Sequence, residues 1–142
     1  MPQTNILFPC FVMVGLTAAV WARLYFERVG EMRTRRIRPQ DISTARQVAE
    51  KLQNVNAADN FRNLFEVPVL FYALCSLALA SQAVTPVLVA GAWVFVVLRA
   101  LHSFIHCTYN RAMHRFAVYL LSTLVLFAMW VAFAASVLRI AA

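Results

Sequence analysis

The sequence predicts an all-α membrane protein built as a bundle of four transmembrane helices. Only 13% of its 142 residues are charged, against about 25% in a typical soluble domain. Three uncharged stretches, Met1–Ala22, Val67–Leu98 and Phe116–Leu138, reach or exceed the roughly 20 residues that a helix needs to cross a bilayer. Lipid offers the backbone no hydrogen-bond partners, so each stretch is expected to satisfy its own backbone groups as a helix.

The middle stretch is too long for one span, and the polar, turn-forming run SQAVTP (81–86) divides it. We therefore expect four spans within one domain of residues 1–142, at about 6–26, 64–80, 85–106 and 116–138. The first span lacks a basic segment ahead of it and is followed by Arg23 and Glu27. A cleaved signal peptide shows the opposite order, so this span is expected to be retained.

The net charge of +7 is concentrated in two loops. The loop at 28–58 holds seven basic residues: Arg28, Arg33, Arg35, Arg36, Arg38, Arg46 and Lys51. Arg111 and Arg115 lie between the third and fourth spans. By the positive-inside rule, both loops of this multi-pass protein are expected to be cytoplasmic, with both termini on the opposite side. The run RTRRIR (33–38) is expected to bind anionic lipid headgroups, and no nucleic-acid partner is expected because no aromatic platform accompanies it.

Local signals predict where the helices begin and end in the first half of the chain. Gly30 stands just past the first span, where a C-terminal glycine commonly ends a helix. Asp41 or Ser43 is a suitable cap for a helix that runs without interruption into the second span. Pro68 would then lie inside that helix, and we expect a kink there, with neighbours satisfying the carbonyl that it frees.

Two helices each carry a polar stripe near the cytoplasmic side. Steps of 3, 4 and 3 residues place four polar residues on one face of the second span: Asn56, Asp59, Asn63 and Glu66. The same steps occur at the end of the third span, at Arg99, His102, His106 and Tyr109. Arg62 precedes Glu66 by four residues, so we expect the two to pair along the helix.

Glu66 and Arg99 border the uncharged stretch 67–98 from opposite ends. An ionised group at this depth is costly unless it faces a partner or a wet cavity. The two residues are placed to neutralise each other across the bundle, or to serve a ligand. A simple ion pair would not need the neighbouring Asn63 and histidines, which favours a ligand site. For Tyr109, Arg111 and Arg115 taken alone, a position in the headgroup region is the better interpretation.

These side chains suit a small, charged ligand. Guanidinium groups bind carboxylates through paired hydrogen bonds, and Glu66 suits an ammonium. A cationic pocket also favours the thiolate form of a bound thiol. The apolar surface between the spans is expected to hold a lipophilic small-molecule substrate.

The motifs resemble the family of membrane-associated proteins in eicosanoid and glutathione metabolism (MAPEG). They are RNLFEVP (62–68) after the basic loop, RALH (99–102) at the end of the third span, and Arg115 with Tyr119 beyond His106. The resemblance implies a homotrimer with glutathione as cosubstrate, bound between subunits near the cytosolic face. It implies a glutathione-dependent transferase or peroxidase acting on lipophilic electrophiles or lipid hydroperoxides, with no metal.

The resemblance also assigns roles to individual residues. Arg115 would stabilise the glutathione thiolate. The residues expected to contact glutathione are Arg62, Asn63, Glu66, Arg99, His102, His106 and Tyr119. Three positions depart from the family pattern: Asp59 stands where relatives often have arginine, His106 where tyrosine is usual, and Phe116 where the prostaglandin synthase has serine. Tyr109, one turn beyond His106, is a candidate substitute for the missing tyrosine, and eicosanoid synthesis is not expected.

Two alternatives remain open at this point. The family includes a lipid-binding member without enzyme activity, so the chain is also interpreted as a possible non-catalytic binding protein. Independently of the family, His102 and His106 lie four residues apart, a helical spacing compatible with a metal ion. Glu66 or His114 would complete such a site, although nothing in the sequence fixes that geometry.

Overall fold

The computed structural model describes residues 2–141, and in this range the chain forms helices without any strand. Its α-helices are α1 (Leu7–Arg35), α2 (Ala45–Lys51), α3 (Asn56–Asn63), α4 (Val67–Ala80), α5 (Pro86–Cys107) and α6 (Ala112–Ala141). Four helical segments are long and apolar enough to cross a membrane: Gln3–Arg35, Asn56–Ala80, Pro86–Cys107 and Ala112–Arg139. The prediction of an all-α, four-span membrane protein is confirmed.

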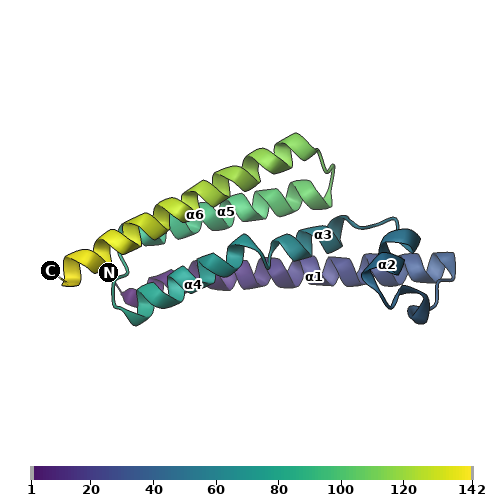
Figure 1. The fold of residues 1–142 in the computed structure, drawn as a ribbon, viewed down its shortest axis with the longest axis horizontal. Helices are drawn as coiled ribbons and strands as arrows, with labels where there is room; N and C mark the ends of the chain where they lie inside the picture. The colour runs from purple at the N-terminus through teal and green to yellow at the C-terminus, as the bar shows by residue number, and fades with distance from the viewer. Residues whose placement is uncertain (1, 142) are drawn as a thin grey trace.

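The helices form an elongated bundle (Figure 1). α1 runs beside α3 and α4, and α5 and α6 form a long hairpin that packs along them. Both termini lie at one end of the bundle, and α2 lies at the other end with the last turns of α1 (Figure 1). A chain that crosses the membrane an even number of times has both termini on the same side, in agreement with this arrangement. Which end faces the cytoplasm stays a prediction.

The core lies where the two pairs of long helices meet. Phe71 of α4 stacks on Phe95 of α5, with ring centroids 4.7 Å apart, and Met13 of α1 and Leu126 of α6 are also fully buried. Large apolar side chains are exposed along the outer surface of the bundle, as Phe11 and Val131 illustrate. This arrangement suits a helix bundle whose outer surface is solvated by lipid rather than water.

The expected end of the first helix at Gly30 is wrong, because α1 continues to Arg35. Arg36 then takes a left-handed conformation (φ 54°) and closes the helix. Contacts beyond the glycine hold these last turns in place. Buried Glu31 accepts hydrogen bonds from the backbone nitrogens of Gln53 (2.7 Å) and Asn54 (3.0 Å). A helical glycine costs only about 1 kcal/mol relative to alanine, which such contacts readily offset.

The uninterrupted helix expected from Asp41 or Ser43 is also wrong. α2 begins after Thr44, whose side chain accepts from the Gln47 backbone nitrogen. The chain then leaves the helix between α2 and α3, where Glu31 binds it. A second break separates α3 from α4, just ahead of Pro68. Pro68 lies in the first turn of α4 and not at a kink within a helix, because a first turn needs no backbone N–H there.

Turns at the two ends of α5 complete the bundle. At its start, the Thr85 hydroxyl accepts from the Leu88 backbone nitrogen (3.2 Å), and Pro86 occupies the first turn, so the interruption expected at 81–86 is a turn. At its end, α5 stops at Cys107 and α6 begins at Ala112. Asn110 lies in this second turn with a left-handed backbone (φ 45°).

Candidate functional site

The break between α3 and α4 brings Arg99 into the site. With the helix interrupted after Asn63, the Asn63 carbonyl accepts from Arg99 Nη2 (2.9 Å). The Arg99 side chain is fully buried, and its guanidinium lies 5.4 Å from the centre of the Tyr119 ring. Its Nε and Nη1 atoms are buried without a hydrogen-bond partner among the described residues. Buried donors without a protein partner are costly, which makes the Arg99 guanidinium a candidate to bind an acceptor group of a ligand.

A polar hollow of about 420 Å³ lies between the α3–α4 junction and the α5–α6 hairpin. Its lining residues are Asn63, Glu66, His102, Ala112, Arg115, Phe116 and Tyr119. Five of these were expected from the sequence to contact glutathione or its thiolate. Arg99 and His106 do not line the hollow, because both are buried within the protein next to it.

His102 joins α5 to α6 at this hollow. Its Nδ1 donates to the backbone carbonyl of Arg115 (3.2 Å), and its ring centre lies 5.6 Å from that of Tyr119. With the proton on Nδ1, the neutral ring carries its lone pair on Nε2. That atom is buried without a partner among the described residues. It is therefore available as an acceptor for an N–H group of a ligand.

The guanidinium of Arg115 is held by two neutral acceptors. Its Nη1 donates to the Asn110 side-chain oxygen (2.8 Å) and lies 3.2 Å from His106 Nε2. Because a guanidinium has no acceptor, His106 must accept with Nε2 and carry its proton on Nδ1. No hydrogen bond of the described residues involves Nε or Nη2 of Arg115, so the side chain keeps donors for a ligand while its charge is not neutralised.

The described part of the chain contains neither the expected Arg62–Glu66 ion pair nor the Glu66–Arg99 pair that is the alternative to a ligand site. Arg62 pairs with Asp59 (3.6 Å) and not with Glu66. Glu66 lies beyond the end of α3, so the two side chains no longer have the spacing of one continuous helix. Arg99 binds the Asn63 carbonyl and forms no ion pair with Glu66. Arg62 is exposed and does not line the hollow.

Tyr109 does not belong to the polar stripe of α5. The helix ends at Cys107, so Tyr109 turns outward, is exposed, and lies with its hydroxyl 3.3 Å from His114 Nδ1. It does not line the hollow and does not replace the family tyrosine there. His114 is likewise engaged away from the His102–His106 pair. Residues 2–141 contain no group of three or more histidine, cysteine or carboxylate side chains placed to hold a metal ion.

Sequence reasoning missed the polar contacts that fix α3 against α5. Asn60 is fully buried. Its side-chain oxygen accepts from the Ser103 hydroxyl (3.3 Å), and its nitrogen donates to the Cys107 sulfur (3.4 Å). A signal for it was present, because Asn60 stands four residues after Asn56 and three before Asn63, on the same side of a helix. These contacts hold the carbonyl of Asn63 within reach of Arg99.

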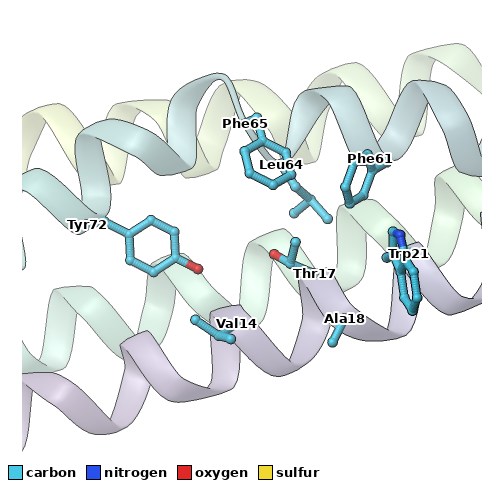
Figure 2. Close-up of a pocket in the computed structure, with 8 residues that line it drawn as sticks. All are labelled: Val14, Thr17, Ala18, Trp21, Phe61, Leu64, Phe65 and Tyr72. Atoms are coloured by element: carbon cyan, nitrogen blue, oxygen red, sulfur yellow. The ribbon is translucent and has the colours of Figure 1, made fainter.

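A second, apolar hollow of about 460 Å³ lies on the other side of the α3–α4 junction, against α1 (Figure 2). Its lining residues are Val14, Thr17, Ala18, Trp21, Phe61, Leu64, Phe65 and Tyr72. The few polar atoms there include the hydroxyls of Thr17 and Tyr72, and the Thr17 hydroxyl already donates to the Met13 carbonyl (2.9 Å). This hollow is suited to apolar groups, and it shares no lining residue with the polar hollow.

The comparisons with known proteins agree with this architecture. A family model described as MAPEG family matches residues 6–135. The chain belongs to the MAPEG family. The matched residues of this MAPEG chain cover the second and third spans and most of the first and fourth, and they include every residue of the polar hollow. Searches among curated proteins and among solved structures give no significant match.

MAPEG membership confirms the resemblance drawn from the two short motifs and establishes an integral, multi-pass membrane protein. The family includes glutathione transferases and peroxidases as well as non-catalytic members. Membership therefore narrows the activity to a few classes without selecting one. The choice among these classes depends on the side chains of the polar hollow.

Proposed function

We propose that this MAPEG protein is a glutathione-dependent transferase or peroxidase acting on lipophilic electrophiles or lipid hydroperoxides. The main support for the proposal is the environment of Arg99. This residue is fully buried, and two of its guanidinium nitrogens have no hydrogen-bond partner among the described residues. It lies next to a hollow that contains Arg115 and His102. Removing a cation from water without a partner is costly. A ligand with carboxylate groups offsets that cost, and glutathione carries two.

The donor and acceptor groups in the hollow, together with Arg99 buried beside it, match those of glutathione. Arg99 offers two donors for a carboxylate, His102 Nε2 accepts from a peptide N–H, and Glu66 suits the ligand ammonium. Arg115 remains for the thiolate. The volume of about 420 Å³ lies in the usual range for small-molecule sites. Asp59 fits less well, but its pairing with Arg62 limits its repulsion of the ligand carboxylates.

In this mechanism Arg115 stabilises the negative charge that develops on sulfur. A fixed cation favours the thiolate, and the thiol proton leaves to water through the open side of the hollow. The thiolate then attacks an electrophilic carbon, a C–S bond forms, and the leaving group departs with its electron pair. With a hydroperoxide, the thiolate attacks the terminal peroxide oxygen. The O–O bond breaks to give a glutathione sulfenic acid and an alkoxide, which takes a proton from water and leaves as the alcohol. A second glutathione reduces the sulfenic acid, giving the disulfide and water.

The lipophilic substrate reaches this sulfur from the bilayer over α6. Phe116 lines the hollow beside Arg115 and is exposed, as are Met113 and Leu120 on the same helix. Steps of three and four residues place Met113, Phe116 and Leu120 on one face of α6, which is proposed as the route from lipid to the hollow. An electrophile or hydroperoxide dissolved in the membrane can therefore approach without crossing a charged surface.

We place the complete site at a subunit interface of a homotrimer. Glu66 is exposed in the single chain, and Arg62 lies outside the hollow. A neighbouring subunit on this side would cover part of the ligand and bring it within reach of Arg62. MAPEG proteins are typically trimers, and this arrangement gives the two exposed charges a role.

The basic loop is proposed to lie on the anionic cytoplasmic leaflet. Arg35 pairs with Glu31 (2.9 Å) and Arg38 with Asp41 (3.2 Å), and the Arg38 guanidinium lowers the pKa of the Asp41 carboxyl. Arg33 and Arg36 are exposed and form no ion pair among the described residues. Two unpaired arginines at the end of α1 would bind lipid headgroups and fix the cytoplasmic orientation of the loops.

Two measurements on the purified protein test the function. First, glutathione should raise the melting temperature in detergent, whereas the absence of any shift or binding heat would contradict the proposal. Second, the protein should accelerate glutathione conjugation to chlorodinitrobenzene or reduction of a lipid hydroperoxide. Binding without a rate above background for either substrate class would instead identify a non-catalytic member of the family.

A further inference from the structure

We propose that Asn110, oriented by Asn56, is a positioning residue that fixes the Arg115 guanidinium at the thiol. The inference rests on the proposed function and adds a role that neither the family match nor the motifs assign. Asn110 does not line the hollow and is not expected to touch glutathione. It would act only through Arg115.

The turn between α5 and α6 presents the Asn110 side chain to Arg115. The Asn110 backbone is left-handed (φ 45°), a conformation that asparagine tolerates better than most residues. Its backbone nitrogen donates to the Ile105 carbonyl (2.9 Å), which ties the turn to the end of α5. From this fixed position, the side-chain oxygen accepts from Arg115 Nη1 (2.8 Å).

Asn56 determines which end of the Asn110 amide faces Arg115. Asn110 Nδ2 donates to the Asn56 side-chain oxygen across the gap to α3 (2.8 Å). With its nitrogen occupied in this way, the amide must turn its oxygen toward the guanidinium. A chain of hydrogen bonds thus runs from α3 through the turn to Arg115, so the position of Arg115 depends on the packing of α3.

Neutral partners suit an arginine that must stabilise an anion. A carboxylate partner would hold the side chain equally well but would cancel its charge. Asn110 and His106 hold Nη1 through neutral acceptors and leave Nε and Nη2 for the thiolate. Fixing a long, flexible side chain before the ligand arrives reduces the entropy lost when the charge develops.

Asn110→Gly tests the placement of Arg115 without glutathione. Glycine accepts the left-handed turn, so this variant removes the side chain without straining the backbone. The matched control is Gln82→Gly, which replaces another left-handed residue (φ 54°) at the opposite end of α5. Phenylglyoxal modification of Arg115, followed by peptide mass spectrometry, is compared with that of exposed Arg111 in the same sample. We expect the Arg115 rate relative to Arg111 to rise several-fold in Asn110→Gly and to stay constant in Gln82→Gly. An unchanged ratio in Asn110→Gly would overturn the proposal.

The second readout is the ultraviolet absorbance of bound glutathione thiolate, followed as a function of pH. Asn110→Gly should raise the thiol pKa and lower kcat by about 10- to 100-fold, with little change in KM for glutathione. Asn56→Ala should act in the same direction, and Asn56→Asp, which keeps an acceptor for Asn110, should restore wild-type behaviour. Faster modification of Arg115 in Asn110→Gly together with an unchanged thiol pKa would contradict the positioning role. If wild-type protein binds no glutathione, the proposed function fails, and the modification ratio still decides whether Asn110 holds Arg115.

Discussion

The guanidinium Nη1 of Arg115 lies 3.2 Å from Nε2 of His106. We propose that this contact gives a role to the histidine, which stands where the resemblance to the family leads us to expect a tyrosine. His106 is buried and does not line the hollow, so we propose that it holds Arg115 by accepting a hydrogen bond and does not contact glutathione. The neutral ring meets this requirement without cancelling the arginine charge.

Two substitutions of His106 distinguish the role of its acceptor nitrogen from the role of its volume. His106→Gln keeps an acceptor on a side chain of similar reach, whereas His106→Leu fills the space without one. We expect His106→Leu to lower the thiol-dependent kcat by about tenfold, the loss of one positioning hydrogen bond. Steady-state kinetics should show a smaller loss in His106→Gln. Equal losses in the two variants would assign packing, and not hydrogen bonding, to His106.

Glu66→Gln should weaken glutathione binding more than it slows the chemistry. Glu66 lines the hollow and is proposed to bind the ligand ammonium, a charge-assisted interaction of about 1.5–3 kcal/mol. The same interaction is present before and during the reaction, so KM for glutathione should rise at least about tenfold with kcat nearly unchanged. Titration calorimetry and initial rates measure the two effects. A fall in kcat at constant KM would place Glu66 in the chemical step instead.

Asn60→Ala should destabilise the bundle. The Asn60 amide is fully buried and bonds both Ser103 and Cys107 of α5. Its removal leaves the Ser103 hydroxyl without that partner, at a cost of about 1–3 kcal/mol. The matched control is Asn54→Ala, since Asn54 is exposed and bonds Glu31 through its backbone nitrogen. In detergent, the melting temperature should fall clearly for Asn60→Ala and not for Asn54→Ala. Similar melting temperatures for both variants would argue against a stabilising role of the Asn60 contacts.

Gly91→Ala should loosen the packing of α5 on α6. A Cβ atom at Gly91 would lie 2.8 Å from Cγ of Met129, which is itself buried. Relieving such a clash in a packed core typically costs about 1–3 kcal/mol. Gly15→Ala is the control, because nothing lies within 4 Å of a Cβ added there. The melting temperature should fall for Gly91→Ala and stay constant or rise for Gly15→Ala. The reverse order would show that Met129 moves aside freely.

Much of the fold was predictable from hydrophobic runs and turn residues. Four spans, the turn ahead of Pro86 and the all-α class follow from segments whose length and composition leave one solution in lipid. The extension of α1 past Gly30 was not predictable locally, because it depends on Glu31 meeting the backbone at Gln53 and Asn54. Propensity favoured a stop there, and a tertiary contact overrode it.

The site was predictable in part. Helical spacing predicted one face with Asn63 and Glu66 and another with Arg99 and His102, and the structure places three of these in the hollow and Arg99 beside it. That prediction assumed, however, that both helices were continuous. The break ahead of Pro68 displaced Glu66 from Arg62, and the end of α5 at Cys107 removed Tyr109 from its stripe. The roles of Asn60 and Asn110 depend on contacts between distant segments. Spacing along one helix contains no information about such contacts.

Arg115 is proposed to stabilise a glutathione thiolate, so the conjugation rate of Arg115→Ala decides the proposed function. The control is Arg111→Ala, which removes an exposed arginine from the same loop. Both variants are assayed with glutathione and chlorodinitrobenzene after size-exclusion chromatography shows assembly like that of the wild type. We predict that the conjugation rate of Arg115→Ala is at least about 100-fold below that of the wild type, whereas Arg111→Ala keeps the wild-type rate. A wild-type rate in correctly assembled Arg115→Ala would contradict the account.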